Sequence, residues 1–388
     1  MTAVSAGKAH RSTFGHFIPL TVPELDRATL VHAASVADLA APSTLGPATV
    51  RVERMLAAGF GAAVAHLTTG ATTALEVLAI ALRARGYRRA IVPSFTHVSS
   101  ASAFALHGYQ VEFVDVDDQL LIDARSVEAT GVDAETVVLA VHYGGQHGDL
   151  RAVEAICQAA GALLVEDFAH SFSSRFAVPS VRPAGAAAIV SFQLYKEITC
   201  GEGGALLLFD ADLDETVRTI RDRGTNRRDF EAGAADTYTW VSQGSSFAPS
   251  ELTATVLEAH LERRSSIIQP RRHVLRRYCH ELSSWADLVG ARLPEQALDA
   301  GAANTAYVQV GDESERRSLA SHLDLHGIGS AFHFPPLHRS PMARHLGTPA
   351  DGCPGSDRAF AGLLRLPLHT SLTDLQVDAI IEAVASWR

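Results

Sequence analysis

Three segments of the chain combine hydrogen-bonding or reactive side chains with the close spacing that an active site needs. The first is a turn of small residues, 68–75, that runs directly into an apolar helix. Backbone N–H groups at the start of a helix attract anions, and the hydroxyl group of Thr72 adds another donor. This turn could therefore hold a phosphate group, although ordinary helix capping produces the same pattern.

The second segment contains two acids, Glu166 and Asp167, at the end of a buried apolar run that leads to His170. The carboxyl end of a strand is the edge at which α/β sheets place their ligands. Asp167 could bind a metal, orient a histidine or hold a protonated ring nitrogen, and the alternative is a cap for the following turn. The strand context favours a functional carboxylate.

The third segment contains a lysine, Lys196, that follows another apolar run and precedes the glycine-rich turn 201–204. An amine in this position can be partly desolvated and made nucleophilic, whereas a single lysine is more often a solvated surface charge. The order of the three segments favours the first interpretation. Pyridoxal phosphate needs an anion site, a carboxylate that keeps its pyridine nitrogen protonated, and an amine for the Schiff base. The sequence therefore predicts this cofactor.

Short apolar strands that alternate with helical patterns must position the three segments. Alternation of this type predicts an α/β domain with a mainly parallel sheet over about residues 50–245. The expected strands are 90–92, 111–114, 137–141, 162–165, 187–192 and 205–209, and the expected helices include 72–85, 99–107 and 149–160.

The pattern changes after Pro249, where a helical and charged stretch continues to about Trp285. It predicts a connecting helix that is broken at Pro270, because proline lacks the N–H group that a helix interior needs. Strands 306–310 and 329–332 and a final helix 373–387 predict a small α+β domain. We therefore expect an N-terminal tail (1–16), a large cofactor-binding domain (17–248), and a connecting helix with a small C-terminal domain (249–388).

Composition excludes several other classes of protein. Of the 388 residues 47% are hydrophobic and 20% are charged, which is typical of a globular chain rather than a disordered one. A net charge of −10 argues against nucleic acid as a partner, and no run reaches the roughly 18 apolar residues that span a bilayer. Four cysteines without a CxxC pair predict reduced thiols and a cytoplasmic location, and the 18 histidines lack metal-binding spacing, so no metal is expected.

An ordered series of further motifs gives the chain a specific resemblance. Stretches 93–99, 113–117, 141–146 and 166–170 resemble, in order, those of the DegT/DnrJ/EryC1/StrS sugar aminotransferases, and the similarity extends from about Phe17 to Trp387. These enzymes have the aspartate-aminotransferase-like fold type I. Stretches 223–227, 238–240, 244–247 and 332–338 resemble the branch that makes dTDP-4-amino-4,6-dideoxygalactose.

The resemblance implies roles for individual residues around pyridoxal phosphate. Lys196 would be the Schiff-base lysine, Asp167 the partner of the pyridine nitrogen, and His170 a neighbour of the cofactor's 3-oxygen. His97 stands where relatives usually stack an aromatic ring on the cofactor, and we expect its imidazole to be neutral beside a cationic pyridinium. The residues that would hold the phosphate are Ala71, Thr72, Ser191 and, from the neighbouring subunit of a homodimer, Ser246. Residues 70–71 are Gly-Ala where Ser-Gly or Ser-Cys is usual, which removes one hydroxyl group from this site.

The resemblance also implies the reaction, which is transfer of an amino group, with glutamate as donor, to a nucleotide-linked keto-sugar such as dTDP-4-keto-6-deoxy-D-glucose. Trp240 and His338 are candidates for shaping the sugar pocket or for packing. The arginines of residues 223–228 could bind a diphosphate or form a solvated helix end.

Three alternatives remain. One is transamination of a cyclitol or another non-nucleotide ketone. A sugar dehydratase is disfavoured by Lys196, because relatives with that activity have histidine there. A cofactor-binding regulator would need a DNA-binding domain, for which the stretch before Phe17 is too short.

Overall fold

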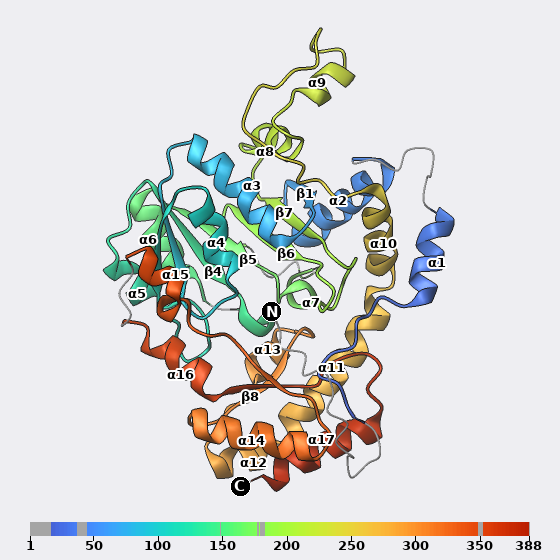
Figure 1. The fold of residues 1–388 in the computed structure, drawn as a ribbon, viewed down its shortest axis with the longest axis vertical. Coiled ribbons are helices and arrows are strands. Elements are labelled where there is room, and N and C mark those ends of the chain that lie inside the picture. The colour runs from blue at the N-terminus through green and yellow to red at the C-terminus, as the bar shows by residue number, and fades with distance from the viewer. Residues whose placement is uncertain are drawn as a thin grey trace.

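A computed structural model describes residues 17–36, 45–147, 149–176, 178, 183–347 and 352–387, so the expected tail 1–16 lies outside the described residues. The largest element is a seven-stranded sheet with the order β1-β7-β6-β5-β4-β2-β3, which helices surround (Figure 1). Its strands are β1 (Val64–Thr68), β2 (Arg89–Pro93), β3 (Gln110–Val114), β4 (Thr136–Val141), β5 (Leu163–Asp167), β6 (Ala187–Ser191) and β7 (Gly204–Leu208).

The sheet is mainly parallel, which confirms the predicted fold class. Strands β2 to β6 pair in parallel, whereas β7 is antiparallel to both of its neighbours, β6 and β1. Successive residues of a strand face opposite sides of the sheet. Ile189 packs with α3, α4 and α8 on one face, and the next residue, Val190, packs with α2 and α10 on the other. Helices on both faces explain why these strands read as continuous apolar runs.

The helices beside this sheet begin after short loops at either end of the strands. They are α2 (Pro47–Phe60), α3 (Ala71–Ala84), α4 (Ser99–Leu106), α5 (Ala124–Ala129), η1 (Tyr143–Gly145), α6 (Arg151–Ala160), α7 (Phe172–Arg175), α8 (Asp214–Arg221) and α10 (Glu251–Glu262), with α1 (Arg27–Val36) packed on α10. The part of the chain that the structure describes contains no helix long and apolar enough to cross a membrane.

A second, three-stranded sheet has the order β8-β10-β9 and is antiparallel throughout. We call it, together with α11, α12, α14 and α17, the C-terminal layer. The elements of the chain from Arg264 onward are α11 (Arg264–Glu281), α12 (Ser283–Val289), α13 (Glu295–Asp299), β8 (Ala306–Gln309), α14 (Glu313–Leu325), β9 (Ala331–Phe332), η2 (Leu337–Arg339), α15 (Pro341–His345), α16 (Pro354–Gly362), β10 (Leu363–Leu366) and α17 (Asp374–Ser386).

The C-terminal layer has its own apolar core, and residues from near the start of the described chain join it. Ile18 is buried in this core and pairs in parallel with Ile328. The chain near Ile18 thus contacts the second sheet, although we expected it in the large domain. The division at residues 248 and 249 stays a prediction.

The helix break lies elsewhere than expected. Helix α10 ends before Arg263, and α11 continues through Pro270 without interruption, so the prediction of a break at Pro270 was wrong. A single proline removes one backbone hydrogen bond, and apolar packing of Ile267, Val274 and Leu275 holds the helix together around it.

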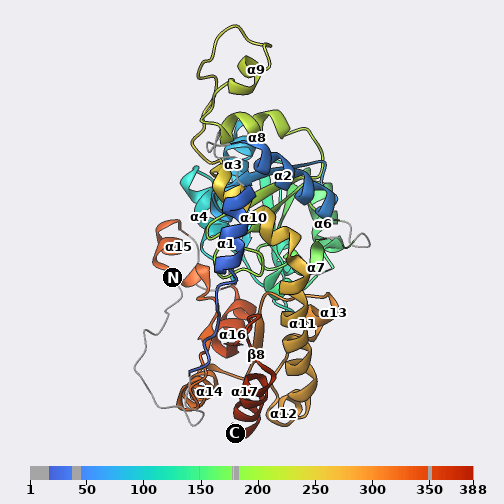
Figure 2. The same cartoon turned by 90° about the vertical axis from the view of Figure 1, so that its right-hand side faces the viewer.

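Residues 223–246 form an arm that projects from the end of α8, away from the sheet (Figures 1 and 2). It carries the short helix α9 (Arg227–Glu231) and closes on itself through the pairing of Thr225 with Trp240. Three of its aromatic side chains, Phe230, Tyr238 and Trp240, are exposed.

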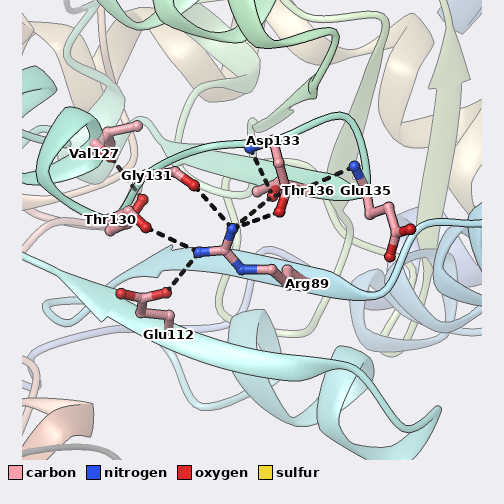
Figure 3. A network of polar contacts seen from close by, with 8 residues as sticks. All are labelled: Arg89, Glu112, Val127, Thr130, Gly131, Asp133, Glu135 and Thr136. Atoms are coloured by element: carbon pink, nitrogen blue, oxygen red, sulfur yellow. Dashed lines mark hydrogen bonds and ion pairs between the residues drawn. The ribbon is translucent and has the colours of Figure 1, made fainter.

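The amino end of β2 is closed by the arginine network shown in Figure 3. The Arg89 guanidinium donates to the carbonyl oxygens of Thr130 (3.1 Å) and Gly131 (3.0 Å) and to the carboxylates of Glu112 (3.1 Å) and Asp133 (3.0 Å). These acceptors come from β3 and from the loop before β4, so a single side chain ties three segments together.

Candidate active site

The register of the sheet brings three of the predicted segments to one edge. Gly204, the first residue of β7, pairs with Ser191 of β6 on one side and with Thr68 of β1 on the other. The adjacent parallel strand β5 ends at Asp167 at the same edge. The turn before α3 and the strand ends therefore meet, as the sequence predicted for a ligand site in an α/β sheet.

The start of α3 lies against β7 so closely that only glycine fits between them. A Cβ atom on Gly204 would lie 2.3 Å from the carbonyl carbon of Gly70 and 2.4 Å from the nitrogen of Ala71. The N–H groups of the first turn of α3 have no acceptor within the helix. The Thr72 hydroxyl is 2.7 Å from that of Ser99, a residue to which the sequence assigned no role. This cluster of donors can hold a phosphate group.

Asp167 is buried at the end of β5 and accepts a hydrogen bond from the backbone nitrogen of Ala169 (2.8 Å). Burial raises the pKa of Asp167, while that hydrogen bond and the positive charge of Lys196 act in the opposite direction. Burial also lowers the pKa of Lys196 to about 8, against the influence of Asp167. The structure thus brings the predicted amine and carboxylate together.

Both carboxylate oxygens of the neighbouring acid, Glu166, accept hydrogen bonds from groups of the protein itself. One carboxylate oxygen accepts from His142 Nε2 (2.8 Å) and Arg175 (3.1 Å), and the other accepts from the backbone nitrogens of Ala184 (2.8 Å) and Gly185 (2.9 Å). Burial opposes ionisation of Glu166, but these donors lower its pKa to about 2. Of the two acids, Glu166 supports the strand end and Asp167 is left to face a ligand.

His170 forms part of an aromatic wall above this edge. Its ring lies 5.4 Å from that of Tyr143, and the rings of His333 and Phe334 stack 4.2 Å apart beside it. Burial, followed by the charge of Lys196, lowers the pKa of His170 well below its ordinary value. Its imidazole is therefore neutral and can donate or accept a hydrogen bond.

His97 lies at the rim of the site. Its Nδ1 is 3.0 Å from the hydroxyl group of Ser99, and its ring meets Phe334 edge to face at 6.1 Å. Burial and then the charge of Lys196 lower the pKa of His97, which is the direction that a neutral ring stacked on a cationic pyridinium requires.

The remaining predicted residues lie in other places. Ser246 stands at the base of the arm, where its hydroxyl accepts from Arg223 (3.2 Å). Trp240 is 76% exposed on the arm, whereas His338 is 1% exposed, with Nδ1 2.6 Å from the Ser94 hydroxyl. No contact between Trp240 and His338 is found among the described residues, so one chain does not bring these two candidates together. Their roles remain predictions.

One further charged residue, Arg365, faces the site and was missed from the sequence. It lies in β10, where its neighbours Leu364 and Leu366 belong to the core of the C-terminal layer. Because side chains alternate along a strand, Arg365 faces the opposite side, toward Tyr143 and Tyr307. A charge inside the apolar run 363–366 is the signal that could have found it.

Together these groups fit pyridoxal phosphate. A buried amine of lowered pKa, a buried carboxylate and a helix start with free N–H groups and a hydroxyl lie at one strand edge, where no side chain larger than glycine fits at position 204. Lys196 would hold the aldehyde carbon, Asp167 the ring nitrogen, and Ala71, Thr72 and Ser191 the phosphate.

Comparisons with known proteins place the chain in a family. A model of the DegT/DnrJ/EryC1/StrS aminotransferase family matches residues 26–385. The spore coat polysaccharide biosynthesis protein SpsC of Bacillus subtilis (strain 168) is 27% identical over 382 residues, covering 95% of this chain and 96% of SpsC.

Two solved structures have the same fold. The structure of DesI in the presence of its TDP-sugar product is 25% identical with a TM-score of 0.81, covering 96% of this chain and 93% of DesI. The PLP form of a sugar aminotransferase, Spr1654 from Streptococcus pneumoniae, has a TM-score of 0.82 and 20% identity, with coverage of 96% and 98%. At that identity the second likeness concerns the fold alone.

Proposed function

The chain belongs to the DegT/DnrJ/EryC1/StrS aminotransferase family and is a pyridoxal-phosphate-dependent sugar aminotransferase, and we propose that it aminates a nucleotide-linked 4-keto-6-deoxy sugar. The proposed substrate is dTDP-4-keto-6-deoxy-D-glucose, and the proposed amino donor is glutamate. The observation that carries the proposal is the meeting of Lys196 and Asp167 at the carboxyl edge of the sheet. The TDP-sugar product of the relative DesI supports the substrate class.

Each residue of the site has a task in this reaction. When bound, pyridoxal phosphate supplies an aldehyde and an electron-accepting ring. The Lys196 amine, with its pKa near 8, is available in its neutral form to take the proton from the donor's α-carbon. Asp167, buried beside it, holds the proton on the ring nitrogen, and His170 offers a neutral imidazole to the 3-oxygen. The start of α3 with Thr72 and Ser191 fixes the phosphate.

We also propose a homodimer in which Ser246 completes the phosphate site of the partner. The arm projects away from its own sheet, so its base and its aromatic residues are available to a second copy (Figure 2). Trp240 would then shape the sugar pocket of the partner's site, His338 would act within its own chain, and the arginines near Arg223 would lie by the diphosphate. Four unpaired thiols support a reducing, cytoplasmic location.

The substrate proposal is tested by incubating the purified protein with glutamate and a panel of ketones, with product configuration determined by NMR. The panel holds dTDP- and UDP-linked 4-keto-6-deoxy sugars and a keto-cyclitol, and the Lys196→Ala variant is the blank. We expect an amine at C4 of the dTDP sugar. Amination of the cyclitol in preference to every nucleotide sugar would instead support the alternative.

The dimer proposal is tested by mixing two inactive variants, Lys196→Ala and Ser246→Asp, after unfolding and refolding them together. If the sites are shared across a two-fold axis, half of the dimers are mixed and each has one intact site, so about a quarter of the activity returns. A mixture that stays inactive, or a fully active monomer in sedimentation, would contradict shared sites.

A further inference from the structure

A second acid, Glu197, is buried directly after Lys196 in the chain. Its side chain is 1% exposed. Burial raises the pKa of Glu197, whereas the charge of Arg271 and the donors of Ser173 act in the opposite direction. Burying a carboxylate costs free energy unless hydrogen bonds compensate it. The next residue, Ile198, is apolar and fully buried, so an apolar side chain is also compatible with this turn. The acid at position 197 therefore calls for a separate explanation.

The carboxylate of Glu197 binds the start of α7. Its Oε1 atom accepts a hydrogen bond from the backbone nitrogen of Ser173 at 2.7 Å. Ser173 lies in the first turn of α7, where the N–H groups have no acceptor within the helix. The turn that carries Lys196 is thus bonded to α7 through the side chain of the following residue.

Helix α7 is in turn fixed to the end of β5. It follows the segment that contains Asp167 and His170. At its last residue, the Arg175 guanidinium donates to the carboxylate of Glu166 at 3.1 Å, and Glu166 directly precedes Asp167. Through α7, Glu197 therefore joins the turn of the proposed Schiff-base lysine to the segment of the carboxylate that faces it.

The backbone of Ser173 also contacts α11, which belongs to the C-terminal layer. Its carbonyl oxygen accepts from the Arg272 guanidinium at 2.8 Å. Arg272 Nε donates to the carbonyl oxygen of Gly301 at 2.6 Å. We call the chain of Glu197, Ser173 and Arg272 the Ser173 link. It runs from the Lys196 turn, across α7, to the C-terminal layer.

Other contacts fold the turn itself. The Lys196 backbone nitrogen donates to the carbonyl oxygen of Gln193 at 2.8 Å, and the Thr199 hydroxyl donates to that of Phe192 at 3.0 Å. Ile198 packs in the apolar core beside the large sheet. Apolar packing has no preferred direction, whereas a hydrogen bond has a preferred length and angle. The Ser173 link is therefore suited to fixing where the folded turn lies.

We propose that Glu197 is a positioning residue, which sets the Lys196 amine against Asp167 by bonding the Lys196 turn to α7 and, through Ser173, to Arg272. Position matters for this amine because a displacement of about 1 Å in an active site can cost about 100-fold in rate. The assignment rests on the proposed role of Lys196 and not on which sugar is aminated.

The first test measures how fast the cofactor-free protein captures pyridoxal phosphate, followed by visible absorbance without any substrate. Glu197→Leu removes the acceptor, and we expect capture to slow by about 10-fold or more. Glu197→Gln keeps an oxygen that accepts from Ser173, so it should stay within about threefold of the parent. Glu128→Leu, which replaces an exposed glutamate on α5, is the control and should match the parent.

The second test uses single turnovers of the loaded enzyme. Because Lys196 acts in both half-reactions, Glu197→Leu should lower the saturating rates with glutamate and with the keto-sugar by similar factors. The half-saturating concentrations should change by less than about twofold, since Glu197 touches no substrate. A purely structural contact would lower the melting temperature and leave these rates per folded molecule unchanged.

The other end of the Ser173 link provides an independent variant if Glu197→Leu does not fold. Arg272→Met leaves the Lys196 turn intact, and we expect it to slow capture by about threefold. Arg276→Met, at an exposed position one turn further along α11, is its control and should match the parent. Because both ends act through Ser173, the double variant should be slowed by less than the product of the two single effects.

Several results would overturn the positioning role. They are capture by Glu197→Leu at the parent rate, slowing confined to one half-reaction, independent effects of the two ends, and equal damage in Glu197→Gln and Glu197→Leu. Lys196→Ala is the blank in every assay. Capture by this blank at the parent rate would refute the role of Lys196 in the proposed function and the positioning role with it. A silent blank with normal Glu197→Leu would refute the positioning role alone.

Discussion

Arg89 and Arg365 have the same side chain and opposite surroundings. At the amino end of β2, Arg89 donates to two carboxylates and two carbonyl groups from neighbouring segments (Figure 3). In β10, Arg365 has a single histidine nitrogen as acceptor and a buried Nε without one among the described residues. The first guanidinium supports the fold, and we expect the second to meet a ligand. Saturation of hydrogen bonds is therefore expected to separate a structural charge from a functional one at these two positions.

The same contrast holds for two adjacent residues of β5. Glu166 receives four hydrogen bonds and has a pKa lowered to about 2, whereas Asp167 accepts from the backbone of Ala169 and from the side chain of Ser100 and has a pKa that burial raises. The alternation of a strand sends the two side chains to opposite faces of the sheet. One face is filled by protein donors, and the other opens toward Lys196.

The largest effect is expected from Lys196→Ala, which removes the amine on the side of the sheet that Asp167 faces. Turnover should fall by about 10³-fold or more, because no other group can take the proton at that place. The melting temperature without cofactor should not fall, since the wild-type protein pays for burying this amine. The sequence contains only one other lysine, Lys8, so Lys8→Ala is the control and should keep full activity and the visible absorbance.

A smaller loss, of about 10²-fold in turnover, is expected from Asp167→Asn. The amide still accepts from Ala169, so circular dichroism and cofactor content should match the parent, while the ring nitrogen loses its counter-charge. The matched variant is Glu166→Gln, for which we expect the reverse: normal turnover per folded molecule and a loss of about 2–4 kcal/mol in the free energy of unfolding. If Asp167→Asn is unstable but keeps its full specific activity, Asp167 is a structural residue like Glu166, and the prediction is wrong.

Arg89→Met should affect only the fold. Two carboxylates and two carbonyl groups lose their donor, which should reduce the free energy of unfolding by about 2–3 kcal/mol in urea titrations. Because the network lies at the amino end of β2, kcat/KM at 25 °C should stay within about twofold of the parent value. A catalytic defect without a loss of stability would show that saturation does not mark a structural charge.

The smallest expected effect is a shift in pH dependence. Only a neutral amine attacks a carbonyl group, so the rate at which the cofactor-free protein captures pyridoxal phosphate should rise as the pH passes about 8. Removing the negative charge in Asp167→Asn should move this midpoint to lower pH. Removing the positive charge in Arg365→Met should move it to higher pH, by less than about one unit in each case. Stopped-flow absorbance measures the midpoint of both variants. Shifts in the same direction would contradict the prediction that Asp167 and Arg365 act on the pKa of Lys196 with opposite sign.

The sequence was sufficient for most of the large sheet and failed for β1 and β10. Strands β2 to β7 were predicted because helices cover both faces and leave mainly apolar runs. Strand β1 was missed because it contains His66, which is buried with Nε2 2.9 Å from Asp214, and β10 because it contains Arg365. His66 and Arg365 interrupt the apolar pattern because each contacts residues that are distant along the chain. A pattern read from neighbouring residues does not contain such contacts.

Within the site, the sequence predicted the groups with distinctive chemistry but not the residues that hold them. Lys196 is one of two lysines among 33 basic residues, and arginine, which stays protonated, cannot replace a nucleophilic amine. Ser99, His333 and Arg365 are far apart along the chain, in α4, directly after β9 and in β10. Ser99 acquires its contact when α4 packs beside the start of α3, whereas the contact of His333 with Tyr143 exists only once the two sheets have packed together.

The pairing of Ile18 with Ile328 has a consequence for how the protein is made. At about 5–20 residues per second, a ribosome needs roughly 15–60 s to travel from one partner to the other. During this time the large sheet can form, with Lys196 in place, while residues near Ile18 have no pairing partner until Ile328 has been synthesised. Arg365 is synthesised later still, so the nascent chain can acquire the site for its cofactor before it acquires the arginine whose charge acts on Lys196.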